Sequence, residues 1–310
     1  MSVLTPMTLE PAVADWFARR TYEGSAYSLQ RLLEHKREPI ALILPTRNVG
    51  ETIGAIVDAL VKLRTAGLVD ELLVIDADSR DGTATIARRS GATIAQESEL
   101  LPEHGAARGK GDAMWRGLSA TSAPIVAYLD TDTEDFDPTL ALGLLGPLLV
   151  EQDVTFVKGA FGRPFRLGAE TIPDGGGRVT ELLARPLINL HFPQLAGFVQ
   201  PLAGETAARR ELLEALPFAA GYGVELALLV DALRAVRLER LAQVNLGVRQ
   251  NRHQPLSELG AMAYEVLVAA ERRLAPAPQL AASERFTRPH AGALDTRTVA
   301  VEERPPLVAS

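Results

Sequence analysis

The residues with the clearest chemical potential are two aspartates, Asp130 and Asp132, which directly follow the apolar run 125–129. Such a run predicts a buried strand, and residues two apart on a strand point to the same face. Both carboxylates can therefore converge on one object. A divalent cation and the phosphates that it carries suit this pair, because hard cations take oxygen ligands. Turn formation is the alternative, since Asp is also favoured in turns and helix caps.

Two glycine-rich stretches place cations near expected helix starts. The first, Gly109-Lys110-Gly111, precedes a helix predicted over 111–122, and backbone amides at a helix start favour anions. The second, 173–178, ends in three glycines and Arg178, and arginine suits bidentate recognition of phosphate or carboxylate. A solvated lysine and a plain hinge loop are the alternatives. Two separate anion-binding loops would suit two phosphorylated substrates.

Two further side chains are candidates by position. Asp76 follows the apolar run 72–75, so its carboxylate could reach a ribose or a base at the end of a strand. His253 lies in the loop 248–255, which is rich in arginine and amide side chains. Its imidazole could ligate a metal or contact a phosphate, although a surface histidine would look the same in the sequence.

The elements that must position these groups alternate between strand and helix. Continuous apolar runs predict buried strands, and the stretches between them show the spacing of amphipathic helices. The predicted strands are 40–44, 72–75, 92–95 and 125–129. This alternation implies right-handed crossovers and a mostly parallel sheet, with ligands outside the carboxyl ends of the strands. We therefore expect an α/β fold whose first half binds a nucleotide.

Bulk properties exclude several classes of protein. The chain has 310 residues, 47% of them hydrophobic and 23% charged, which is typical of a soluble globular protein. A net charge of −7 argues against a general nucleic-acid surface, whose phosphates would be repelled. The apolar run 140–150 is too short to span a membrane and contains Pro147. The absence of cysteine and of a signal-peptide pattern leads us to expect a cytoplasmic protein that uses no membrane.

Composition and element pattern suggest four regions. We expect an N-terminal helical extension over 1–38 and a nucleotide-sugar-binding domain over 39–217. A smaller mixed region, 218–275, would serve the acceptor and dimerisation. Residues 276–310 are rich in Pro, Ala and charge, and predict an extended tail.

The motifs together resemble a known family. Pro45 to Asn48, Asp76 and Asp130-Thr131-Asp132 are similar to a GT-A nucleotide-sugar glycosyltransferase. Closer likeness comes from longer runs, in the order 109–116, 175–182, 221–225 and 243–249. These runs resemble the actinobacterial glucosyl-3-phosphoglycerate synthases, a group that also includes a mannosyl-3-phosphoglycerate synthase. The resemblance covers roughly residues 38 to 270.

The resemblance implies a function. It is the retaining transfer of a hexose from UDP-glucose, GDP-glucose or GDP-mannose to the 2-hydroxyl of 3-phosphoglycerate. The product would feed the glucosylglycerate or mannosylglycerate pathway of compatible solutes. The resemblance also implies a divalent metal (Mg²⁺, Mn²⁺ or Co²⁺) and a homodimer.

The resemblance further implies roles for individual residues. Those that would hold the nucleotide are Pro45, Thr46, Asn48, Asp76, Ser79, Lys110, Asp130 and Thr131. Those that would line the sugar pocket are Leu202, Tyr222 and Glu225. Those that would hold phosphoglycerate are Gly177, Arg178, Thr180 and Asn251. The metal ligands would be Asp132 and His253, and the catalytic set Asp132, Lys110 and Glu225.

Two departures from the family pattern leave questions open. The family usually has acidic residues after the Asn of its first motif, where this chain has Val49 and Gly50. The choice between uridine and guanosine, and with it between glucose and mannose, therefore stays open. The family also has a metal-binding histidine where this chain has Asn251, with His253 two residues later. Either residue could complete the metal site.

Two other functions fit parts of the sequence. A polyprenyl-phosphate glycosyltransferase would share the first half but use a lipid acceptor and usually a membrane anchor, for which we find no pattern. A non-catalytic nucleotide-sugar binding protein would bind the donor and transfer nothing. Transfer that depends on 3-phosphoglycerate distinguishes the first reading from both.

Overall fold

The computed structural model describes residues 6–133, 136–167, 170–172, 176–249, 256–274, 284–290 and 293–309. Its centre is a sheet of eight strands in the order β1-β11-β6-β9-β5-β2-β3-β4. The strands are β1 (Thr21–Glu23), β2 (Ile40–Thr46), β3 (Glu71–Asp76), β4 (Thr93–Gln96), β5 (Ile125–Tyr128), β6 (Phe156–Gly162), β9 (Thr206–Arg209) and β11 (Leu241–Val248). Only β9 runs antiparallel to its neighbours, β5 and β6. The expected α/β fold with a mostly parallel sheet is confirmed.

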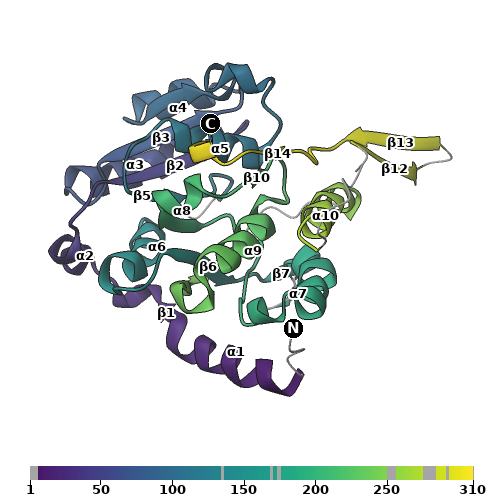
Figure 1. Ribbon diagram of the computed structural model, residues 1–310. Coiled ribbons are helices and arrows are strands. Elements are labelled where there is room, and N and C mark those ends of the chain that lie inside the picture. Colours follow the sequence, from purple (N-terminus) through teal and green to yellow (C-terminus); the bar gives the residue numbers. More distant parts are fainter. Residues whose placement is uncertain are drawn as a thin grey trace.

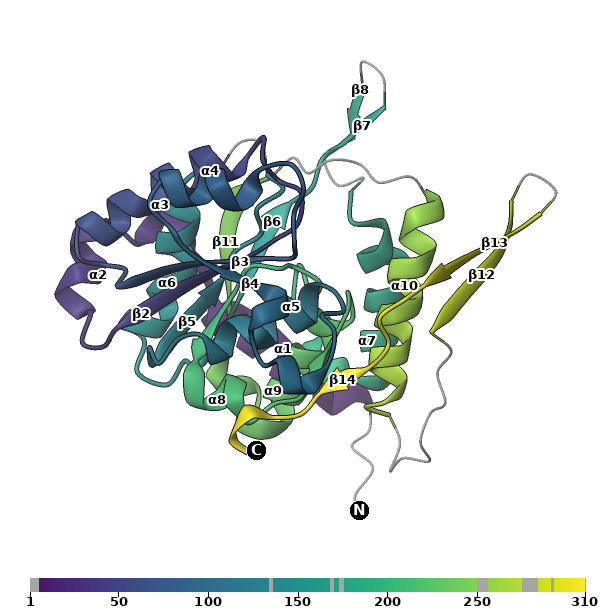
Figure 2. The same ribbon diagram turned by 90° about the horizontal axis from the view of Figure 1, so that it is seen from above.

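Helices cover both faces of this sheet (Figures 1 and 2). The helices are α1 (Pro6–Arg20), α2 (Leu29–His35), α3 (Ile53–Thr65), α4 (Thr83–Arg89), α5 (Lys110–Ser119), α6 (Thr139–Val150), α7 (Arg185–His191), α8 (Arg210–Glu214), α9 (Val224–Val236) and α10 (Leu256–Glu271). One core joins one face of the sheet to α3 and α6, and the other joins the opposite face to α5 and α9. Strand β2 contributes to both cores because successive side chains on a strand point to opposite faces. Leu42 and Leu44 belong to the first core, and Ile43, between them, belongs to the second.

Helix α3 shows how the sequence specifies its packing. The residues that it buries are Ile53, Ile56, Val57, Leu60 and Leu63. Their spacing of three and four residues forms one apolar stripe along the helix. The stripe lies against the sheet, so the periodicity that predicts the helix also fixes its orientation.

The C-terminal segment differs from the expected extended tail. Strands β12 (Arg285–His290) and β13 (Ala293–Thr298) form a hairpin, and β14 (Glu303–Arg304) pairs with β10 (Phe218–Ala219). Figure 1 shows β14, in yellow, lying beside α5 and β10. The end of the chain is therefore part of the folded body.

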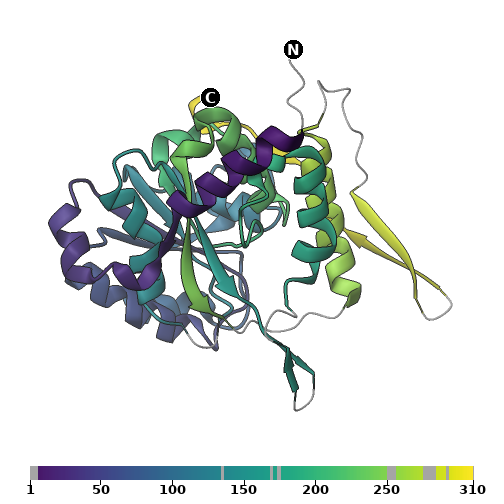
Figure 3. The same cartoon turned by 90° about the horizontal axis from the view of Figure 1, so that it is seen from below.

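Other elements refine the sequence prediction. Strands β1 and β11 join the main sheet from outside the expected 39–217 domain. A small hairpin of β7 (Phe165–Leu167) and β8 (Glu170–Ile172) extends beyond the sheet (Figure 3). Among the described residues, no helix is both long and apolar enough to cross a membrane.

Candidate active site

A cavity of about 1150 Å³ opens at the carboxyl ends of β2, β3 and β5 and extends to α10. This is the edge at which ligands bind in open parallel sheets. The expected site residues that line it are Pro45, Thr46, Asn48, Lys110, Asp130, Thr131, Asp132, Gly177, Arg178, Thr180, Leu202, Tyr222 and Glu225. The structure thus brings the expected nucleotide, sugar and acceptor residues to one cavity.

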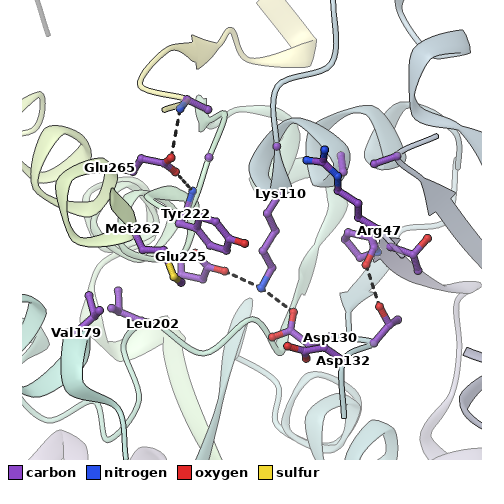
Figure 4. A pocket seen from close by; sticks show the side chains of 18 of the residues that line it. Arg47, Lys110, Asp130, Asp132, Val179, Leu202, Tyr222, Glu225, Met262 and Glu265 are labelled. Carbon is purple, nitrogen blue, oxygen red and sulfur yellow. Dashed lines mark hydrogen bonds and ion pairs between the residues drawn. The ribbon is translucent and has the colours of Figure 1, made fainter. Parts of the chain in front are cut away.

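Lys110 stands at the centre of this cavity (Figure 4). Its Nζ lies 2.6 Å from Oδ1 of Asp130 and 2.8 Å from Oε1 of Glu225. Lys110 is the first residue of α5, which approaches the β10 segment very closely. A Cβ on Gly111 would lie 1.8 Å from the carbonyl oxygen of Ala219. Only glycine at that position lets α5 begin where Lys110 reaches both carboxylates.

The pKa values of Lys110, Asp130 and Asp132 are shifted in different ways by the site. Burial alone would lower the pKa of Lys110, but Asp130 and Glu225 outweigh it and raise that pKa above its usual value. Burial disfavours the charged form of Asp130 too, and Lys110 overcomes it, so the pKa of Asp130 is lowered. Burial and the nearby charge of Asp130 raise the pKa of Asp132. Asp132 is therefore the carboxylate whose negative charge the neighbouring cations do not fully balance.

The Asp130–Asp132 segment is fixed by contacts from three directions. The Thr131 hydroxyl donates to the carbonyl oxygen of Pro45 at 3.2 Å, and the Thr52 hydroxyl donates to the carbonyl oxygen of Thr131 at 2.7 Å. A Cβ on Gly204 would lie 2.2 Å from Oδ1 of Asp130, so this glycine makes room for the carboxylate. The backbone between the two aspartates is thus held in place, and the Asp130 carboxylate has a space that fits it.

Asp132 is the residue best placed to hold a divalent metal. Its raised pKa shows that a positive charge at this point would stabilise its ionised form. No group of three metal-ligating side chains forms within the described ranges. His253 and Asn251, the two expected partners at the metal and the acceptor, lie outside the described residues.

Two arginines that the sequence reasoning did not assign lie across the cavity. The guanidinium carbons of Arg163 and Arg249 lie 4.9 and 5.4 Å from the centre of the Phe161 ring. Arg249 also forms a buried ion pair with Glu205. Burial lowers the pKa of both arginines, partly offset by the charges of Asp130 and Asp132. Both follow the ends of strands, β6 and β11, and Arg249 also ends the run 243–249 that carries the family resemblance.

The loop that carries Gly177 and Arg178 leads into an irregular helix. Gly177 has φ of 69°, a left-handed conformation that favours glycine. Residues Thr180–Ala184 form a π-helix, an irregularity often found at functional sites. Thr180 is buried and Arg178 lies on the cavity wall. The loop therefore presents an amide-rich turn and a guanidinium to the cavity.

The side of the cavity that carries Tyr222 depends on a helix far along the chain. The Glu265 carboxylate of α10 accepts from the backbone N–H of Tyr222 at 2.6 Å and from that of Ala300 at 3.2 Å. Figure 4 shows Tyr222, Leu202 and Met262 close to Glu225 on this side. The sequence reasoning missed the contribution of α10 and of residue 300, because both belong to segments without a recognisable motif.

The side of the cavity that carries Asn48 is built from two linked turns. The backbone N–H of Asn48 donates to Oγ of Ser79 at 2.8 Å, and that of Ser79 donates to Oδ2 of Asp76 at 3.1 Å. Asp76 is buried, and neither it nor Ser79 lines the cavity. They support the turn that carries Asn48, and direct contact with a nucleotide stays a prediction for both.

Comparisons with known proteins agree with this geometry. Residues 41–163 match the family model described as glycosyl transferase family 2. The glucosyl-3-phosphoglycerate synthase of Mycolicibacterium smegmatis is 42% identical over 253 residues, which are 81% of this chain and 83% of that protein. The crystal structure of mannosyl-3-phosphoglycerate synthase from Rubrobacter xylanophilus matches with a TM-score of 0.84 and 44% identity, covering 96% of this chain and 99% of the other.

A second similar solved structure contains a metal ion and two bound ligands. It is the glucosyl-3-phosphoglycerate synthase of Mycobacterium tuberculosis in complex with Mn²⁺, UDP-glucose and phosphoglyceric acid. The TM-score is 0.81 at 40% identity, over 91% of this chain and 95% of the other.

Proposed function

Since this chain belongs to the family of glucosyl- and mannosyl-3-phosphoglycerate synthases, which have the GT-A fold, we propose that it transfers a hexose to 3-phosphoglycerate. The donor is a nucleotide diphosphate sugar and the acceptor atom is the 2-hydroxyl. The product is glucosyl- or mannosyl-3-phosphoglycerate. Retention of configuration at the sugar is implied by the family resemblance.

One observation carries the proposal: a single cavity contains two separate groups of anion-binding residues. Lys110, together with the metal that Asp132 would hold, forms one, at the carboxyl ends of the sheet, and the loop with Gly177 and Arg178 forms the other. A donor diphosphate and an acceptor phosphate can occupy them together. The reacting atoms then lie between two fixed anchors, which lowers the entropic cost of bringing them together.

Lys110 serves the departing diphosphate. A lysine ammonium has three donors, and Asp130 and Glu225 take two of them. The third can donate to a diphosphate oxygen, where negative charge develops as the bond to the sugar breaks. Because its pKa is raised, Lys110 keeps its charge throughout the neutral range.

Asp132 would hold the divalent metal, and His253 or Asn251 would complete its ligands. When bound, the metal neutralises the charge on the diphosphate. Arg178 would orient the acceptor through its phosphate, so that the 2-hydroxyl faces the sugar carbon. Tyr222, Leu202 and Glu225 would enclose the hexose.

The test measures product formation directly. The protein is incubated with 3-phosphoglycerate, Mg²⁺ and, in parallel, UDP-glucose, GDP-glucose or GDP-mannose, and the products are identified by mass spectrometry. We expect one glycosyl-3-phosphoglycerate, and release of nucleoside diphosphate only when the acceptor is present. Equal release without 3-phosphoglycerate would contradict the proposal. Transfer to a polyprenyl phosphate instead would favour a lipid-acceptor glycosyltransferase.

Two further points belong to the same proposal. Both substrates are small phosphorylated metabolites, so we place the reaction in the cytoplasm. We also propose a homodimer, which size-exclusion chromatography with light scattering would test.

A further inference from the structure

A buried carboxylate, Glu97, lies on the wall of the same cavity. It begins the short 3-10 turn η2 (Glu97–Glu99) directly after β4. Its side chain is 2% exposed, and within the described part of the chain its Oε1 has no hydrogen-bond partner. A buried carboxylate oxygen without a partner costs free energy, so its presence at a cavity wall calls for a ligand that supplies donors.

The position of Glu97 in the sheet indicates which part of a ligand it meets. Strands β5, β2, β3 and β4 are consecutive in the sheet, with Asp132 after β5 and Glu97 after β4. Three strand spacings separate the two ends, roughly 14 Å. The base is the part of a nucleotide that lies furthest from the diphosphate. If the diphosphate lies at Asp132 and Lys110, the base extends towards Glu97.

The charged groups around Glu97 leave its Oε1 available to a ligand. Four charged groups act on the Glu97 carboxylate. They are Asp112 and Arg116 of α5, Asp78 after β3 and Arg47 after β2. Arg116 is engaged elsewhere, since its Nε donates to Oδ1 of Asp112 at 3.0 Å and its Nη2 to the Gly105 carbonyl oxygen at 2.7 Å. Burial raises the pKa of Glu97 to about 7, with a further contribution from Asp112.

The 3-10 turn that carries Glu97 is itself tied to the cavity wall. The Ser98 hydroxyl donates to Oδ1 of Asp78 at 3.2 Å. Arg47 follows β2, Asp78 and Arg80 follow β3, and all three line the cavity. Arginine guanidinium planes stack on bases and can donate to carbonyl oxygens. Carboxylates and guanidinium groups thus surround the place where the base would lie.

We propose that Glu97 selects guanine, so that the donor is a guanosine diphosphate hexose. Guanine presents N1–H and the N2 amino group side by side, and the two oxygens of one carboxylate can accept from both. Uracil offers a single N3–H, which lies between two carbonyl oxygens. A carboxylate can accept from that N–H with one oxygen, but its second oxygen then meets a carbonyl oxygen and is repelled. Adenine presents an acceptor at N1. This inference rests on the proposed function, because it assumes that the diphosphate lies at Lys110.

The first motif supports the same choice. The backbone N–H of Gly50 donates to Oδ2 of Asp81 at 2.8 Å, and a Cβ at position 50 would lie 3.0 to 3.1 Å from Asp81 atoms. Glycine fits this tight contact, and position 50 therefore offers no side chain to a base. A base in this part of the cavity can therefore meet the side chain of Glu97 but none at position 50.

The test measures nucleotide affinity by isothermal titration calorimetry with Mg²⁺, using GDP, inosine diphosphate and UDP as probes. Inosine diphosphate lacks only the N2 amino group of GDP. For the wild type we expect GDP to bind about 10-fold more tightly than inosine diphosphate and more than 10-fold more tightly than UDP. In Glu97→Gln we expect GDP affinity to fall about 10- to 100-fold, the GDP-to-inosine ratio to approach one, and UDP affinity to change little. Glu99→Gln, at the exposed end of the same turn, is the matched control and should behave as the wild type.

Each outcome separates this inference from the proposed function. If the wild type binds UDP as tightly as GDP, or if Glu97→Gln keeps the GDP-to-inosine ratio, Glu97 does not select the base. The glycosyltransferase proposal still stands in that case if product forms from a UDP-hexose. If none of the three nucleotides binds and no product forms, the proposed function itself fails. A thermal unfolding scan of each variant tests whether its fold is intact.

Discussion

Replacing Arg304 should destabilise the protein although it lies six residues from the C-terminus. Its Nε lies 2.9 Å from Oδ1 of Asp112, and its Nη2 lies 2.5 Å from Oδ2 of the same carboxylate. Its Nη1 donates to the carbonyl oxygen of His104 at 2.6 Å, and its Nη2 also donates to that of Ala106 at 3.0 Å. The Asp112 side chain is completely buried, two residues after Lys110. Arg304 thus fastens the end of the chain to the loop that leads to the candidate catalytic lysine.

The expected loss can be derived from these contacts. Removing one partner of a buried ion pair generally costs about 3 to 5 kcal/mol, because the other charge stays buried. Arg116 still neutralises Asp112, with Nε at 3.0 Å from its Oδ1, so the lower end of that range applies. We expect Arg304→Ala to lose about 3 kcal/mol in the free energy of unfolding. In a chain of this size this loss lowers the Tm by roughly 5 °C.

Urea unfolding followed by tryptophan fluorescence measures this loss, since Trp115 lies under the Arg304 guanidinium at 5.7 Å. Arg297→Ala is the matched control in the same segment. Its ion pair with Glu258 is one-third to almost one-half exposed, and an exposed pair contributes less than about 1 kcal/mol. A loss of less than 1 kcal/mol in Arg304→Ala, or equal losses in both variants, would refute this account of the C-terminal segment.

The remaining predictions concern the site. Chelation with EDTA should abolish transfer, and Asp132→Asn should lower kcat/KM at least about 100-fold with Mg²⁺ present, in a product assay; activity above one-tenth in either case contradicts the metal role. Lys110→Ala should lower kcat/KM about 100- to 1000-fold, and since its pKa is raised, the wild-type rate should show no loss from Lys110 deprotonation up to pH 9. Glu265→Gln should raise the donor KM about 10-fold more than it changes kcat, because it weakens the bond to the Tyr222 amide; an unchanged KM speaks against that link. Folding raises the pKa of Glu97 from 4.5 to about 7, so wild-type stability falls as pH rises through this window. The stability of Glu97→Gln relative to the wild type should therefore increase between pH 5 and pH 8 in urea unfolding, and an unchanged difference is the contrary result.

Much of the fold follows from local patterns. The apolar runs at β2, β3 and β5 specify strands because both faces of the central sheet are covered. Alternation with α3 and α5 then requires a parallel sheet and places Asp130 at its ligand-binding edge. The segment 197–203 is a contrasting case. Its residues are mostly apolar, as in a buried strand, but the chain turns there, and Phe198 fills the core.

The sequence by itself brought Lys110, Asp130 and Asp132 to one place, since all three lie within one run of helix and strand. Local periodicity was sufficient to aim these side chains at the same edge of the sheet. Only the tertiary structure decided that Glu265 of α10 holds Tyr222, that Arg304 neutralises Asp112, and that Glu97 lies buried on the cavity wall. The Arg304–Asp112 contact spans 192 residues. Whether a charged residue is paired, exposed or left without a partner depends on segments distant in the chain, and no local pattern contains that information.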